Sequence, residues 1–185
     1  MGIQNNLLPS RIYLQDYAGD YKRFIEAVYQ VFEEDFVKHR PSFGGYRLGL
    51  KYHPAFQDRP YTFYHMTHKG DVESERIPDL RRCECMHWGR PTVEMAKEWS
   101  LKFWEQERKG KHRICIWLDV EDDVDYFFIL DVRKTFVLPW TAFVAEYNHE
   151  VRKRKKEYTR WLEEQGGEVY TPEKLVKKIM DSLSK

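Results

Sequence analysis

Apolar residues recur at intervals of three and four in several parts of the chain, which predicts amphipathic helices. One helix follows Asp20, a residue type favoured at the N-cap, and ends near Pro41. A second begins near Thr92 and ends at the Lys109-Gly110 pair. A long basic helix is expected over about 146–165, and a short one over about 172–184.

Alternating apolar and polar residues predict strands in the rest of the chain. Residues 46–52 alternate after a Gly-Gly pair, and residues 61–67 are rich in aromatic and β-branched side chains. Short turns separate three later strand patterns, which predicts an antiparallel meander over 113–119, 126–132 and 135–145.

Residues 71–91 show no period and contain many charges and turn formers, so we expect a long irregular surface segment. Long ordered loops are commonly functional.

This order of elements predicts an α+β fold with helices packed on one face of a curved antiparallel β-sheet. A single domain is expected over 1–185, because the chain has the length of one ordinary domain. Within it we expect an N-terminal helical extension over about 1–42 and a core over about 46–165, followed by the C-terminal helix.

The composition indicates a folded chain with an aromatic core, since 33% of the residues are charged and 16% are aromatic. The net charge of +1 says little about partners. The chain has no basic and apolar leader and no apolar run near 18 residues, so we expect neither secretion nor membrane insertion. An odd set of three cysteines, with Cys83 and Cys85 nearly adjacent, is typical of a reducing cytoplasm.

The candidate chemistry begins at His65 and Thr67, which would project side by side from a strand over 61–67. A histidine near neutrality can act as general base or acid in metal-independent RNA cleavage, in which a guanidinium stabilises the phosphorane. The alternative is a partly buried histidine that is bonded to a neighbour and inert.

Arginines crowd the segment that follows. Four fall within fifteen residues, interleaved with His87 and Trp88, and guanidinium groups match phosphate oxygens bidentately. The alternative is that these arginines pair with nearby carboxylates and fix the loop. The candidate substrate-binding residues here are Thr67, His68, Arg76, Arg81, His87 and Arg90. The fourth arginine of the group is Arg82.

A zinc site is a further possibility at Cys83, Cys85 and His87, with His65 or His68 as a fourth ligand. The spacing differs from that of a zinc knuckle, so we expect no metal and treat the cysteines as small buried hydrophobic residues.

Two later strands supply Arg113, at a strand entry, and Thr141, within an apolar strand. Alternation places Thr141 on the face of Val137 and Phe143. Thr141 is either a site group or a core hydroxyl with its own hydrogen bonds.

The long helix carries six basic residues in nine, over 152–160. Such a cluster can follow a phosphate backbone, or it can be a solvated helix face. The residues that we assign to substrate binding are Arg152, Lys153 and Lys156.

These tracts together resemble phage and prophage proteins grouped with barnase, EndoU, colicin and RelE type nucleases. The resemblance covers about 61–156 and rests on residues 63–68, 76–84, 113–118, 126–130 and 138–143. It implies a metal-independent ribonuclease without a cofactor, with RNA as substrate and a protein antitoxin or immunity partner. By resemblance the catalytic residues are His65, Arg82, Arg113 and Thr141.

Two alternatives remain. Residues 64–68 also look like the opening strand motif of NAD-dependent ADP-ribosyltransferases, although no strand glutamate follows as that family requires. The other alternative is a non-catalytic protein that binds nucleic acid through the basic helix.

Overall fold

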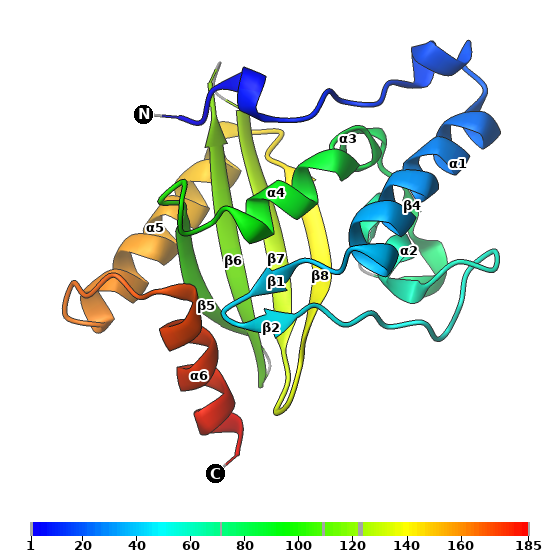
Figure 1. The fold of residues 1–185 in the computed structure, drawn as a ribbon. Coiled ribbons are helices and arrows are strands. Elements are labelled where there is room, and N and C mark those ends of the chain that lie inside the picture. Colours follow the sequence, from blue (N-terminus) through cyan, green and yellow to red (C-terminus); the bar gives the residue numbers. More distant parts are fainter. Residues whose placement is uncertain (1, 71, 109, 122–123, 185) are drawn as a thin grey trace.

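The protein is seen in a computed structural model that describes residues 2–70, 72–108, 110–121 and 124–184. Asp71 and Lys109, which fall in the expected loop and at the expected end of the second helix, lie outside this part. A four-stranded antiparallel sheet with strand order β5-β6-β7-β8 forms the centre (Figure 1). Its strands are β5 (Lys102–Arg108), β6 (Lys111–Val120), β7 (Val124–Val132) and β8 (Val137–Val144).

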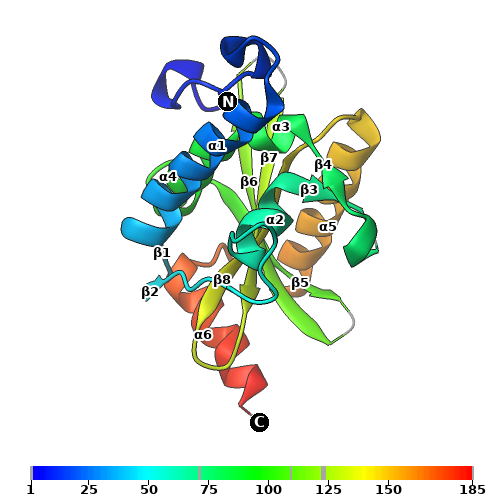
Figure 2. The same cartoon turned by 90° about the vertical axis from the view of Figure 1, so that its right-hand side faces the viewer.

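Helices surround this sheet, so the expected α+β class is confirmed (Figures 1 and 2). They are α1 (Tyr21–Phe32), α2 (Tyr61–Thr67), α3 (Leu80–Glu84), α4 (Gly89–Glu94), α5 (Asn148–Glu164) and α6 (Pro172–Leu183). Short helical turns add Asn5–Leu7, Leu14–Tyr17, Glu33–Lys38, Glu73–Glu75 and Met86–Trp88, and two small hairpins pair β1 (Ser42–Phe43) with β2 (Tyr46–Arg47) and β3 (His68–Lys69) with β4 (Ile77–Pro78).

The sheet is covered on both faces, not on one as expected. On one face, Phe36 stacks on Phe128 of β7 with ring centroids 6.0 Å apart. On the other face, Trp104 of β5 meets Tyr158 of α5 edge to face at 5.7 Å. Figure 1 shows α4 in front of the sheet and α5 behind it. Gly89 allows α4 to approach closely, since a Cβ atom there would lie 2.9 Å from the rings of Phe36 and Phe128.

The first helix and the two C-terminal helices form where the pattern predicts them. The Asp20 side chain accepts a hydrogen bond from the Arg23 amide and caps α1. Thr171 caps α6 in the same way through the Lys174 amide. In α5, Trp161 is buried, whereas Tyr147 at the N-cap is 60% exposed.

Residues 61–67 form the helix α2, so the expected strand is wrong. Every residue of this helix is buried, because Phe63 packs edge to face on Tyr29 of α1 while His65 packs on Trp140 of β8. A short helix with protein on all sides has no polar face, and its composition therefore shows no helical period. Thr67 accordingly does not project beside His65 as it would in a strand.

The second expected helix is shorter than its pattern. It ends with α4 at Glu94, and the chain enters β5 at Lys102 through a turn in which Ser100 adopts a positive φ of 51°. Phe103 was expected on the helix, but it faces the core from the strand. β5 thus adds a fourth strand to the expected meander.

Two other expectations fail in part. Of residues 46–52 only Tyr46–Arg47 pair as a strand, although the amide of Gly49 still donates to the carbonyl of Val137 at 2.8 Å. The segment expected to be irregular from 71 to 91 contains α3, the turn Met86–Trp88 and the start of α4. Its turns are shorter than the window in which a helical period can be seen.

A β-bulge interrupts β8. Ile129 pairs with Thr141, whereas Leu130 pairs with Pro139, so Trp140 is the extra residue. A proline is tolerated here because β8 is an edge strand. The bulge changes the expected alternation, since Thr141 shares its face with Phe143 but no longer with Val137.

Candidate functional site

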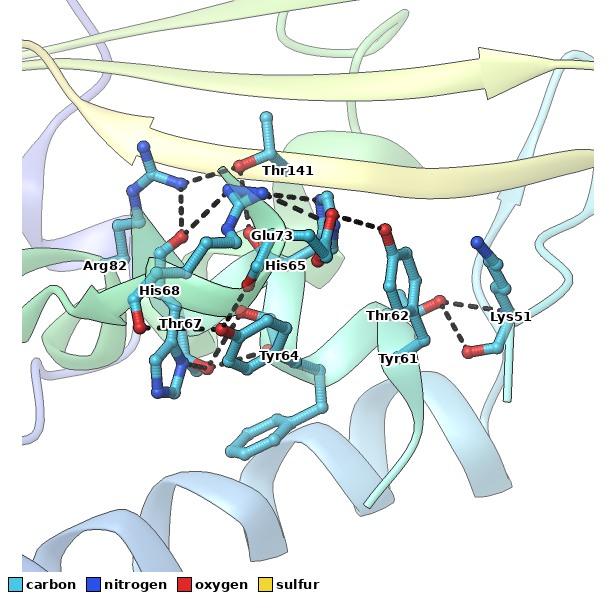
Figure 3. A network of polar contacts seen from close by, with 12 residues as sticks. Lys51, Tyr61, Thr62, Tyr64, His65, Thr67, His68, Glu73, Arg82 and Thr141 are labelled. Carbon is cyan, nitrogen blue, oxygen red and sulfur yellow. Dashed lines mark hydrogen bonds and ion pairs between the residues drawn. The ribbon is translucent and has the colours of Figure 1, made fainter. Parts of the chain in front are cut away.

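The predicted residues His65, Arg82 and Thr141 meet where α2, α3 and the edge strand β8 come together (Figure 3). The Thr141 hydroxyl donates to the backbone carbonyl of His65 at 3.1 Å. Arg82 Nη1 donates to the Thr141 hydroxyl oxygen at 2.9 Å and to the carbonyl of His68 at 3.1 Å. Arg82 Nε also lies 3.3 Å from a carboxylate oxygen of Asp79. Thr141 therefore ties α2 and α3 to the sheet edge.

The His65 ring is 3% exposed and has protein partners at both nitrogens. Nε2 lies 2.9 Å from Glu73 Oε1, and Nδ1 lies 3.2 Å from Arg76 Nη1. Burial, and after it the nearby Arg76 charge, lower the pKa of His65 to about 4. Since a guanidinium can only donate, Nδ1 is the acceptor and the neutral ring donates from Nε2 to Glu73. No nitrogen of His65 is left to take a substrate proton in this arrangement.

His65 also lies in the middle of a row of tilted ring contacts with a cation at each end, which we call the aromatic column. Its ring centroid is 4.3 Å from that of Tyr61 and 4.6 Å from that of Trp140. The ammonium of Lys51 lies 3.7 Å from the centre of the Tyr61 ring, and the guanidinium of Arg113 lies 4.2 Å from that of Trp140. Arg113, the fourth predicted catalytic residue, thus reaches His65 only through Trp140.

Thr67 and His68 serve the local structure of α2. The Thr67 hydroxyl donates to the carbonyl of Phe63 at 2.8 Å, and its oxygen lies 2.9 Å from His68 Nδ1, from which it can accept. Burial and the charge of Arg76 lower the pKa of His68 to about 4. Arg76 also donates from Nη2 to the carbonyl of His68 at 3.2 Å, which joins it to the cluster.

The remaining predicted residues of this region lie elsewhere. Arg90 forms ion pairs with Asp35 at 3.3 Å and with Glu94 at 3.2 Å, as the alternative of loop-fixing pairs expects. Burial raises the pKa of Asp35, and His87 in the turn Met86–Trp88 lies close enough for its charge to oppose that rise. Arg81 is exposed on α3.

The cysteines are core residues. Cys83, Cys85 and Cys115 are free thiols with no exposed surface, and burial raises the pKa of each to about 12. Within the described ranges, no three side chains of His, Cys, Asp or Glu come together as metal ligands would.

The basic helix α5 presents an exposed charged face. Its exposed cations form no ion pair with any described residue, whereas Arg154 of the same helix pairs with Glu157 at 3.0 Å and lies over the ring of Phe143. A hollow of about 700 Å³ runs along this face. The exposed cations are Arg152, Lys153, Lys155, Lys156 and Arg160.

A second hollow, of about 740 Å³, lies between the aromatic column and the turn that joins β7 to β8. We call it the turn pocket. Sequence reasoning missed its two carboxylates, Glu73 and Asp131. Asp131 carries a visible signal, because it is the one carboxylate within the apolar run 126–132. Glu73 carries none, since it is one of many charges in the segment 71–91. The lining includes Lys51, Tyr61, Lys111, Arg133, Lys134, Phe136, Leu138 and Trp140.

Neither the hydropathy of the helices nor comparison with known proteins assigns a function. In the described part of the chain, no helix has both the length and the apolar character needed to cross a membrane. No protein-family model matches the sequence, and it has no significant match among curated proteins or solved structures.

Proposed function

We propose that the protein binds RNA along the exposed face of α5. The observation that carries the proposal is the set of five exposed cations without an ion pair to any described residue. From Arg152 to Arg160 they extend about 12 Å along the helix axis, at about 1.5 Å per residue. Neutralising phosphates with such cations releases counterions, which makes binding favourable and dependent on salt.

RNA is the polyanion that we favour, because the tracts over 61–156 resemble ribonucleases. Whole-molecule charge does not drive this binding, since the net charge is only +1. The basic face must therefore act locally, within the screening length of about 8 Å at physiological ionic strength.

The test compares two triple variants in RNA binding by fluorescence anisotropy over a series of salt concentrations. The first neutralises α5 through Arg152→Gln, Lys153→Gln and Lys156→Gln. The control removes as many exposed charges elsewhere, through Lys22→Gln, Arg23→Gln and Lys177→Gln. If three phosphate contacts are lost, the slope of log K against log salt should fall by about 2 in the first variant only. Equal weakening in both variants, or equal binding of single-stranded DNA, would contradict the proposal.

Ribonuclease activity is the second candidate, favoured by a carboxylate that lines the turn pocket and shares a histidine neighbour with a guanidinium. The Glu73 side chain is 51% exposed, and its carboxylate and Arg76 share His65 as a neighbour. Burial alone would raise the pKa of Glu73, but hydrogen bonds from Tyr61 and His65 outweigh it and lower the pKa. Glu73, ionised at neutral pH, is the group that would accept a 2′-hydroxyl proton, with Arg76 stabilising the phosphorane.

This activity is tested by incubating the protein with total RNA in the presence of EDTA. The wild type and Glu75→Gln should fragment RNA, whereas Glu73→Gln should not, since Glu75 is an exposed neighbour on the same turn. Intact RNA with the wild type would refute the nuclease and leave RNA binding by α5 standing.

We do not favour the ADP-ribosyltransferase alternative, because of where the tract that suggested it lies. It requires a strand at residues 64–68, and this tract lies in the helix α2 and the short β3 that follows it.

A further inference from the structure

The turn pocket contains a buried carboxylate oxygen that has no partner. Asp131 is 1% exposed, and its Oδ2 is held by Arg133 at 2.6 Å from Nη2 and 2.8 Å from Nε. Oδ1 forms no hydrogen bond with any described residue. Buried acceptors are nearly always satisfied in folded proteins, so a donor is expected at this point. Because Asp131 lines the pocket, that donor can come from a ligand.

A buried donor without a partner lies on the neighbouring strand. Arg113 is directly paired with Asp131 across β6 and β7, and its Nε forms no hydrogen bond within the described ranges. The two residues thus offer an acceptor and a donor close together. Of the two residues only Asp131 lines the turn pocket, so a ligand there must carry an N–H for Asp131 Oδ1, and the edge of a nucleobase offers such a donor.

The rim of the pocket supplies an aromatic surface and cations. Phe136, in the turn between β7 and β8, is 46% exposed and packs on no other ring among the described residues. A free ring of this kind can stack on a base. Lys111 and Lys134 are exposed on the same rim and form no ion pair in the described part of the chain. Ammonium groups are suited to a phosphate.

We propose that the turn pocket binds one nucleotide, with its base against Phe136, a base N–H donating to Asp131 Oδ1, and its phosphate beside Lys111 and Lys134. A volume of about 740 Å³ lies within the range of small-molecule sites. The ligand is either a free nucleoside 5′-monophosphate or a nucleotide of an RNA strand, since both present the same groups. The site does not depend on α5, and it stands if RNA binding by that helix fails.

Titration calorimetry with AMP, GMP, CMP and UMP tests the site, with ribose 5-phosphate as the ligand that has no base. At least one nucleotide should bind at sub-millimolar concentration, and ribose 5-phosphate at least tenfold more weakly. Phe136→Ala should weaken the nucleotide at least tenfold, whereas Tyr147→Ala, which removes an exposed ring on α5, should leave it unchanged. Lys134→Gln should weaken it, whereas Lys177→Gln, which removes an exposed charge on α6, should not.

Asp131 is tested without a variant that could fail to fold. The best nucleotide is compared with its analogue methylated at the base N–H groups, which should bind at least tenfold more weakly. A trinucleotide RNA separates the two sources: tighter binding than the monophosphate, retained in the α5 triple variant, assigns the pocket to a strand, and equal binding assigns it to free nucleotide. The proposal is overturned if no nucleotide binds, if ribose 5-phosphate binds equally well, or if Phe136→Ala has no effect.

Discussion

Thr141 offers a sharp test of how the site is held together, because valine has nearly its shape and lacks its hydroxyl. Thr141→Val removes the hydrogen bond to the carbonyl of His65 and the one accepted from Arg82. A neutral hydrogen bond contributes about 1 kcal/mol and one to a charged group about 1.5 to 3 kcal/mol. The Arg82 bond belongs at the low end, because the same nitrogen also donates to the carbonyl of His68.

The expected loss of unfolding free energy for Thr141→Val is therefore about 2 to 3 kcal/mol. For a chain of this length it corresponds to a fall in Tm of roughly 5 to 10 °C. Thr141→Ser keeps the hydroxyl and removes one methyl group, so its loss should stay below about 1 kcal/mol.

Urea unfolding followed by tryptophan fluorescence measures both variants, with an unchanged m value as the sign that the denatured state is the same. Two results would refute the reasoning: a Val variant as stable as the wild type, or a Ser variant that loses as much as the Val variant. The second would mean that the methyl group, not the hydroxyl, stabilises the junction of α2, α3 and β8.

Three other predictions follow from burial. The pKa of His65 and that of His68 are about 4 in the folded protein, against 6.5 in the unfolded chain. The free energy of unfolding is therefore constant with respect to these groups above pH 6.5 and falls as the pH drops toward 4, by on the order of 3 kcal/mol for each histidine. Urea midpoints at pH 7.5 and at pH 5 will detect this fall. The three cysteines should resist a thiol reagent in the native protein and react in urea; fast native labelling would contradict their burial. Gly44→Ala should destabilise the protein strongly, because at its φ of 58° the new Cβ atom would lie 2.7 Å from the carbonyl oxygen of Pro172. Gly45 has a φ of 85°, but a Cβ atom there would meet no atom within 4 Å, so Gly45→Ala should lower the thermal midpoint less. Equal thermal midpoints for the two glycine variants would be evidence against that contact.

The helices α1 and α5 follow from the sequence because each keeps one polar face. The meander follows for another reason, because β7 and most of β6 are short apolar runs rich in aromatic and β-branched residues and bounded by turns. The helix α2 could not be predicted, since a segment buried by α1 on one side and β8 on the other has no polar face to reveal its period. In that case tertiary contacts override the strand propensity of its aromatic residues.

The candidate site was predictable in part. The family resemblance named His65, Arg82 and Thr141 together, and the three residues meet in the structure. Their roles could not be predicted, because burial and mutual hydrogen bonds decide which groups remain available. Glu73 could not be singled out, since its position depends on how the loop after β3 folds back over α2. Asp131 could have been, as a charge within an apolar strand usually has a reason to be there.

The bulge at Trp140 makes the site depend on residue count as well as on residue type. Removing one residue between Leu138 and Thr141 would restore the regular ladder and leave the core side of the sheet intact. It would also break the aromatic column, since Trp140 could no longer sit beside His65. In a chain with the same fold, an interval of three residues between the β8 partners of Asp131 and Ile129, here Leu138 and Thr141, indicates this site. A chain in which that interval is two should have the sheet without the site.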